Sequence, residues 1–145
     1  MIDYIIECCA TDFVIVFRML FAAFVGCVIG YERQRMGKSA GMRTHIIVCM
    51  STAMIVAVSI VHFPVPDSGA RTIAAIITGI GFLGAGQIMN SGGRVSGITT
   101  AASIWTNAMI GSIVGLGYYL VAFFASVVLV FTFRLKKFEG TPWRR

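Results

Sequence analysis

The chain alternates long apolar stretches with short groups of polar residues, glycine and proline. Five stretches have the length and composition of membrane-spanning helices: residues 13–31, 44–63, 72–89, 98–114 and 119–133. Pro64 and Pro66 end the second stretch, and the segment Asn90-Ser91-Gly92-Gly93 predicts a loop after the third.

The fourth and fifth stretches form one apolar run, without a charged residue between Gly97 and Arg134. As one helix it would be roughly 50 Å long at 1.5 Å per residue, whereas the hydrocarbon core of a bilayer is about 30 Å thick. The run must therefore turn, and the segment Gly115-Leu116-Gly117, followed by two interfacial tyrosines, is the predicted turn.

The composition places these helices in a membrane. Of the 145 residues 57% are apolar and 12% are charged, about half the charged share of soluble domains. Only Asp67, Arg71 and Arg94 carry charge between residues 44 and 133. The apolar runs do not alternate as barrel strands do, and the acidic N-terminus does not resemble a signal peptide. We therefore predict an all-α membrane protein, a compact bundle of five transmembrane helices forming a single domain over residues 1–145.

The basic residues predict the orientation of the bundle. With the N-terminus outside, the cytoplasmic segments 32–43, 90–97 and 134–145 hold four, one and five Lys or Arg residues, which is ten of the twelve. This distribution satisfies the positive-inside rule with the C-terminus in the cytoplasm. The net charge of +6 is thus explained by topology and by attraction to the lipid bilayer, and we expect no nucleic-acid partner.

Arg18 is an ionisable residue inside the first span, which makes it a functional candidate. It lies close enough to the outer end to reach the headgroups by snorkelling. The alternative is a buried ion pair or a polar cavity, with Asp67 or Asp12 as the partner. Asp67 can also cap the third span or pair with Arg71.

The segment 31–45 is the densest polar stretch of the chain. It is either a solvated basic loop or a structured loop in which Glu32 pairs with Arg33 or Arg43 and contacts a partner. Thr44 and His45 enter the next helix, where His45 is expected to be hydrogen-bonded at the helix start.

Small residues predict close helix packing. The first span has Ala22, Gly26 and Gly30 at four-residue spacing. Glycines also line the third span: Gly79, Gly81, Gly84 and Gly86. Gly111 and Gly115 form a GxxxG pair in the fourth span.

Thr100, Ser103 and Asn107 share one face of the fourth span. Asn107 lies near the middle of the membrane, where an unpartnered amide is costly. We expect it to bond to another helix, with Gln87 or Trp105 as candidate partners, or to line a small wet cavity.

Motifs for chemistry are absent from the sequence. There is no nucleophile elbow, zinc-protease motif or P-loop, and His45 and His62 lie at opposite ends of one span. Cys8, Cys9, Cys27 and Cys49 form no CxxC pair and are interpreted as small apolar residues, although the adjacent Cys8 and Cys9 can be oxidised. We expect no catalytic, cofactor-binding or metal site and no enzymatic activity.

Four blocks resemble the MgtC/SapB (YhiD-like) family of bacterial inner-membrane proteins: residues 30–34 (GYERQ), 40–45 (AGMRTH), 79–86 (GIGFLGAG) and 97–105 (GITTAASIW). Arg18 resembles the arginine of the family's first span, and Asp67 with Arg71 resembles its acidic-then-basic pair, here one residue further apart. The resemblance implies a link to growth at low magnesium and, for virulence-associated members, to survival inside host cells. It also implies the short form, without the soluble C-terminal domain.

Two functions follow as hypotheses. The first is a non-enzymatic regulator that binds another membrane protein or a second copy of itself. The second is a transporter or channel for Mg²⁺ or another ion, in which an oligomer lines a pore. The polar residues expected to carry function are Arg18, Glu32, Arg33, Arg43, Thr44, His45, Asp67, Arg71, Thr100, Ser103, Trp105 and Asn107.

Overall fold

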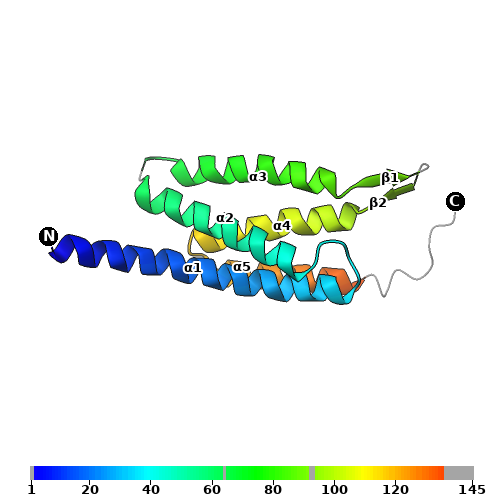
Figure 1. The fold of residues 1–145 in the computed structure, drawn as a ribbon, viewed down its shortest axis with the longest axis horizontal. Coiled ribbons are helices and arrows are strands. Elements are labelled where there is room, and N and C mark those ends of the chain that lie inside the picture. The colour runs from blue at the N-terminus through cyan, green and yellow to red at the C-terminus, as the bar shows by residue number, and fades with distance from the viewer. Residues whose placement is uncertain (1, 64, 92–93, 136–145) are drawn as a thin grey trace.

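The protein is a bundle of five helices with one short hairpin, seen in a computed structural model (Figure 1). The backbone is described for residues 2–63, 65–91 and 94–135, and side chains for residues 9–63, 65–89 and 95–135. The elements are α1 (Ile2–Arg35), α2 (Met42–His62), α3 (Ser68–Gly86), β1 (Met89–Ser91), β2 (Arg94–Ser96), α4 (Ile98–Gly115) and α5 (Tyr119–Arg134). The predicted all-helical class and the five helices are thus confirmed.

Successive helices run in opposite directions along the bundle (Figure 1). The connection between α1 and α2, the hairpin and the end of α5 therefore lie at one end, which we call the basic end. It carries Arg33, Arg35, Lys38, Arg43 and Arg134. The side chain of Arg94 and the basic residues after 135, which enter the orientation prediction, lie outside the described part.

Two expectations about the third segment need correction. α3 ends at Gly86 rather than at residue 89, and the loop predicted after it is an antiparallel hairpin in which Met89 pairs with Ser96 and Ser91 with Arg94. Gly97 follows the hairpin with φ of 88°, and a Cβ there would overlap the carbonyl oxygen of Gln87. Only glycine fits this position, so the start of α4 is fixed against the end of α3.

Helix α2 lies at the centre, between α1 and α4. A Cβ on Gly30 would lie 2.5 Å from the Cα of Met42, and one on Gly115 would lie 2.7 Å from the carbonyl oxygen of Ala53. Gly26 and Gly111 meet the α2 backbone equally closely. The packing role predicted for these four glycines is thus borne out, because only a missing side chain lets the helix backbones approach so far.

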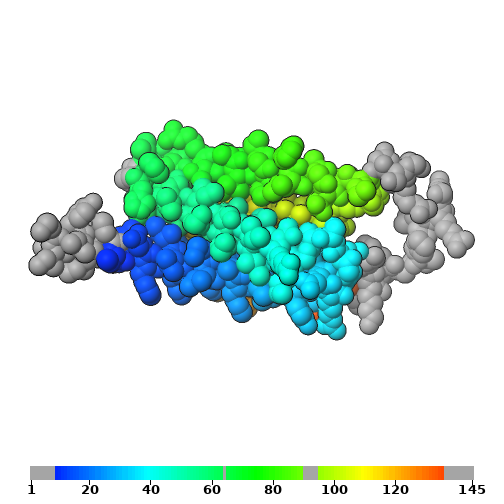
Figure 2. Space-filling view, in the orientation of Figure 1, coloured from blue at the N-terminus to red at the C-terminus, as the bar shows by residue number. Residues whose placement is uncertain are grey.

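Helix α3 is the exception. It runs along one edge of the molecule beside α2 (Figure 2), and only Ile80 and Gly84 of its residues are buried. Gly79, Gly81 and Gly86 have no atom within 4 Å of a built Cβ, and Gly84 makes only ordinary contact with Ala101. The expectation that these glycines pack helices within the chain is therefore wrong for Gly79, Gly81 and Gly86, which face outwards.

Among the described residues, three helical segments are long and apolar enough to cross a membrane: Cys9–Arg35, Met42–His62 and Ser68–Gly86. Large apolar side chains cover the outside of the bundle, among them Phe13, Leu20, Phe24, Phe82 and Leu120, each more than half exposed. Such an apolar exterior fits lipid rather than water.

Candidate functional site

The guanidinium of Arg33 joins three helices at the basic end. Arg33 lies in the last turn of α1 and is 1% exposed. Its Nη2 donates to Thr100 Oγ1 on α4 at 2.7 Å, and its Cζ lies 4.7 Å from the ring centre of Phe133 on α5. Its Nε has no hydrogen-bond partner in the described structure. Of the two alternatives for the segment 31–45, a solvated basic loop and a structured loop, the first does not describe Arg33, which is buried in the bundle.

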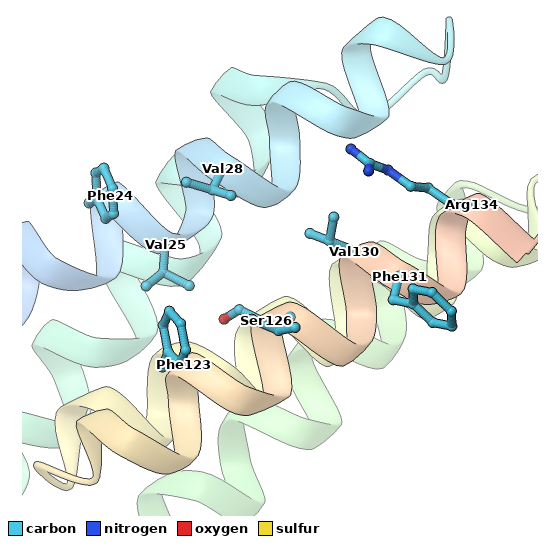
Figure 3. Close-up of a pocket in the computed structure, with 9 residues that line it drawn as sticks. Phe24, Val25, Val28, Phe123, Ser126, Val130, Phe131 and Arg134 are labelled. Carbon is cyan, nitrogen blue, oxygen red and sulfur yellow. The ribbon is translucent and has the colours of Figure 1, made fainter.

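Glu32 pairs with a residue that the sequence analysis did not consider. Arg134 Nε and Nη2 donate to the two carboxylate oxygens at 2.9 and 3.3 Å, which ties the end of α5 to α1. The expected pairing of Glu32 with Arg33 or Arg43 is wrong. Figure 3 shows Arg134 reaching towards α1 at the end of a 320 Å³ apolar groove between α1 and α5, which Val25 and Ser126 also line.

The turn after α1 brings a second basic side chain to the same place. Gly37 has φ of 65°, Gly37 N donates to Gln34 O, and Lys38 N donates to Arg33 O. These are the bonds of a Schellman motif, which glycine permits because it adopts this backbone conformation freely. The motif places Lys38 beside Arg33, and the two residues line a 280 Å³ cavity at the start of α4 and a 460 Å³ cavity between α1, α4 and α5.

Asn107 lies between α2 and α4 and is fully buried. Its Nδ2 donates to the backbone oxygen of His45 at 2.8 Å. His45 is itself buried, with Nδ1 2.9 Å from Gly41 O. The predicted bond to another helix is therefore present, but the candidate partners were wrong. Gln87 instead accepts from Ser39 on the loop after α1, and Trp105 faces outwards.

Thr100 and Ser103 share the buried face of α4 with Asn107, as their spacing predicts. Ser103 Oγ donates to Thr100 O at 2.7 Å, so this hydroxyl is satisfied within its own helix. Thr44 is half-buried and Arg43 is exposed at the start of α2, away from the cavities.

Arg18 lies at the opposite end of the bundle and caps a helix. Its Nη1 donates to Gly115 O in the last turn of α4 at 2.7 Å. A cation at a helix C-terminus satisfies an orphan carbonyl and complements the helix dipole. In the described structure no carboxylate pairs with Arg18, so the predicted ion pair with Asp67 or Asp12 is wrong.

Asp67 begins α3 but makes no side-chain capping bond, and its φ of 67° is left-handed. Arg71 donates to the oxygen of Pro66 at 3.4 Å rather than to Asp67. Both roles considered for Asp67, the cap and the pair with Arg71, are therefore wrong in this structure.

Within the part of the chain that the structure describes, the other candidate groups form no reactive site. Among the described side chains Cys9 is exposed, Cys27 Sγ lies 3.5 Å from Met42 Sδ, and Cys49 is buried. The side chain of Cys8 lies outside the description, so its oxidation remains a prediction. The described residues contain no cluster of three or more His, Cys, Asp or Glu that can hold a metal ion.

Sequence reasoning missed Arg134 and Lys38 as site residues. Both were counted only as topological charges. The signal for Arg134 is a basic residue directly after an apolar span, which can contact the end of another helix. Its partner, Glu32, is distant in sequence and could not be identified from that signal.

Comparison with known proteins identifies the family. The MgtC family model matches residues 19–140. The chain is 38% identical to protein SrpB of Synechococcus elongatus, over 89% of the chain and 79% of SrpB. It is 38% identical to the putative magnesium transporter YhiD of Escherichia coli, over 78% of the chain and 56% of YhiD. It is 40% identical to protein MgtC of Salmonella typhimurium, over 79% of the chain and 49% of MgtC.

The chain thus spans about half the length of YhiD and of MgtC. No solved structure matches. The family match covers most of the chain and agrees with the three apolar helices that are long enough to cross a membrane. This membrane protein therefore belongs to the MgtC family.

Proposed function

We propose that this protein is a non-enzymatic regulator of another membrane protein, in a physiology linked to magnesium limitation. The link to magnesium rests on family membership and on the name of YhiD, a putative magnesium transporter. We further propose that it crosses the bacterial inner membrane five times, with the N-terminus outside and the C-terminus in the cytoplasm.

The observation that carries the proposal is the use of polar groups inside the bundle, of which Arg33 and Asn107 are buried and Arg18 is half-buried. Arg18 caps α4, Arg33 bonds to Thr100, and Asn107 bonds to the α2 backbone. Each of these bonds holds one helix against another. Polar side chains engaged in this way build a rigid scaffold rather than a path for ions.

The carboxylates support the same interpretation. Mg²⁺ prefers oxygen ligands, carboxylates above all. Glu32 is bonded to Arg134 and is the one acid buried among the described side chains. The cavities at the basic end are lined by Arg33 and Lys38, and none of the described residues in either lining is acidic. Such an entrance repels divalent cations.

Transport remains a second candidate because of the name that YhiD carries. The deciding experiment is reconstitution of the purified protein into liposomes that contain a Mg²⁺-sensitive dye. A regulator gives no protein-dependent flux. Saturable flux that is lost in Asn107→Ala would overturn the proposal.

The outward face of α3 is our candidate contact surface for the partner or for a second copy of the chain. Gly79 and Gly86 lie beside Phe82 on this face and add no side chain there, and Phe82 is 82% exposed. A photo-crosslinking residue at Phe82 should give a discrete adduct in native membranes. The matched control is Phe131 on α5, also well exposed, which should not. Failure of both positions to form a discrete adduct would count against a stable partner.

A further inference from the structure

We propose that the cleft at the start of α4 binds the phosphate group of an anion. The shared chemistry is an anionic phosphate group, supplied either by the phosphodiester of an anionic phospholipid headgroup or by free inorganic phosphate. This inference does not depend on the regulatory function proposed above.

The N-terminus of α4 provides the first component of the site. The helix begins after Gly97, which has no side chain, and no side-chain capping bond is present. The first amides of a helix lack intrahelical acceptors and carry the positive end of the helix dipole, a combination that favours phosphate. These amides belong to Ile98, Thr99 and Thr100, which line the 280 Å³ cavity together with Ser96.

Arg33 provides independent evidence for an anionic ligand. It is almost completely buried, it lines the cavity, and its Nε has no partner in the described structure. Its hydrogen bond to Thr100 is to a neutral hydroxyl. In the described part of the chain no carboxylate lies within ion-pair distance of it. A buried cation without a counter-charge is strongly unfavourable, and a bound anion would compensate it.

The remaining lining agrees with this charge. Lys38, positioned by the Schellman turn, is the second basic residue of the cavity, and the lining contains no acid among the residues that the structure describes. The site therefore selects against cations.

The neighbouring cavity bears on the source of the phosphate. It shares Arg33, Lys38 and Thr99 with the first and continues between α4 and α5, where Ala102 and Leu129 line it. A polar cleft that opens into a partly apolar one suits a headgroup with its acyl chain alongside. This continuity makes the lipid headgroup the first source to test.

The test uses the full chain purified in a neutral detergent. In one arm, native mass spectrometry measures binding of phosphatidylglycerol, with phosphatidylcholine for comparison. In the other arm, calorimetry measures binding of inorganic phosphate. Binding of phosphatidylglycerol alone identifies the headgroup, and binding of inorganic phosphate identifies the free anion. Absence of binding in both arms would overturn the proposal.

Two variants test the location without disturbing the buried Arg33. Lys38→Gln removes a cavity charge and should weaken binding about tenfold, the size of one charge-assisted contact. Thr99→Glu places a carboxylate at the helix start, where it is compatible with the dipole, and should abolish binding while the protein stays folded. The matched control Arg35→Gln removes an exposed charge at the same end, outside both linings, and should change binding less than twofold. Equal binding by wild type and the two cavity variants would overturn the proposal.

Discussion

The packing of α4 against α2 can be tested with a matched pair of glycine variants, Gly111→Ala and Gly79→Ala. A Cβ on Gly111 would overlap the hydroxyl of Thr52 and the backbone oxygen of Cys49. A Cβ on Gly79 would meet nothing within 4 Å. Both positions lie inside helices, so the two variants make the same chemical change in opposite packing environments.

The expected magnitudes follow from two terms. Replacing glycine by alanine inside a helix stabilises it by roughly 0.5–1 kcal/mol, and this term is common to both variants. At Gly111 the added methyl must force α4 away from the α2 backbone, and overpacking of this kind costs about 1–3 kcal/mol. The common term cancels in the comparison. Gly111→Ala should therefore be less stable than Gly79→Ala by about 1–3 kcal/mol.

The assay is reversible unfolding in mixed micelles with a rising fraction of SDS, followed by tryptophan fluorescence. Equal free energies of unfolding for the two variants would refute the close α2–α4 contact. A larger loss for Gly79→Ala would instead indicate that the open face of α3 is packed in solution, against a second copy of the chain.

Further predictions concern the polar contacts and the topology. Arg18→Gln should lower the free energy of unfolding by about 1–2 kcal/mol, because it removes a charged hydrogen bond to a helix C-terminus. Arg18→Lys should recover part of this loss. Equal free energies of unfolding for both variants and the wild type would indicate that Arg18 only snorkels. A double-mutant cycle on Glu32→Gln and Arg134→Gln should give a coupling energy close to zero, since the Arg134 side chain is 61% exposed and water screens the pair. A large coupling energy would show a desolvated pair. Asn107→Ala should cost about 1–2 kcal/mol in the same unfolding assay, from an interhelical bond and a small cavity; no loss of stability would argue against the bond to α2. Lys38→Cys, in a background with the native cysteines replaced by alanine, should react with an impermeant maleimide only from the cytoplasmic side, and labelling only from outside would reverse the proposed orientation.

The helices could be predicted from the sequence because the apolar runs end at residues that break helices. The segment Gly115-Leu116-Gly117 did mark the turn between α4 and α5, where Gly117 adopts φ of 92°. The predicted first span, residues 13–31, is shorter than α1 (Ile2–Arg35). The prediction followed apolar residues, whereas a helix continues into polar residues as long as its backbone hydrogen bonds form. The hairpin after α3 was missed because three-residue strands leave almost no periodic signal.

The candidate site residues could be named from the sequence, but their partners could not. Arg18 and Asn107 are unusual inside an apolar span, and the structure places both in contacts between helices. Their acceptors are the backbone oxygens of Gly115 and His45. Every residue carries such an oxygen, so nothing in the sequence distinguishes the one that is used. The ion pair between Glu32 and Arg134 joins residues 102 positions apart, and only the folded bundle brings them together.

The positive-inside rule counts all basic residues of a loop alike, yet the residues at the basic end differ physically. Arg43 is exposed and can serve topology alone, whereas Arg33 is almost completely buried and faces the start of α4. A buried guanidinium beside the positive end of a helix dipole produces a strong local field that favours anions and opposes divalent cations. Any cation path along the α1–α4 interface would have to pass this field at the basic end of the bundle. Arg33, one of the basic residues that predict the orientation, therefore also bears on function. Its charge supports the proposed scaffold that binds an anionic group rather than a channel for Mg²⁺.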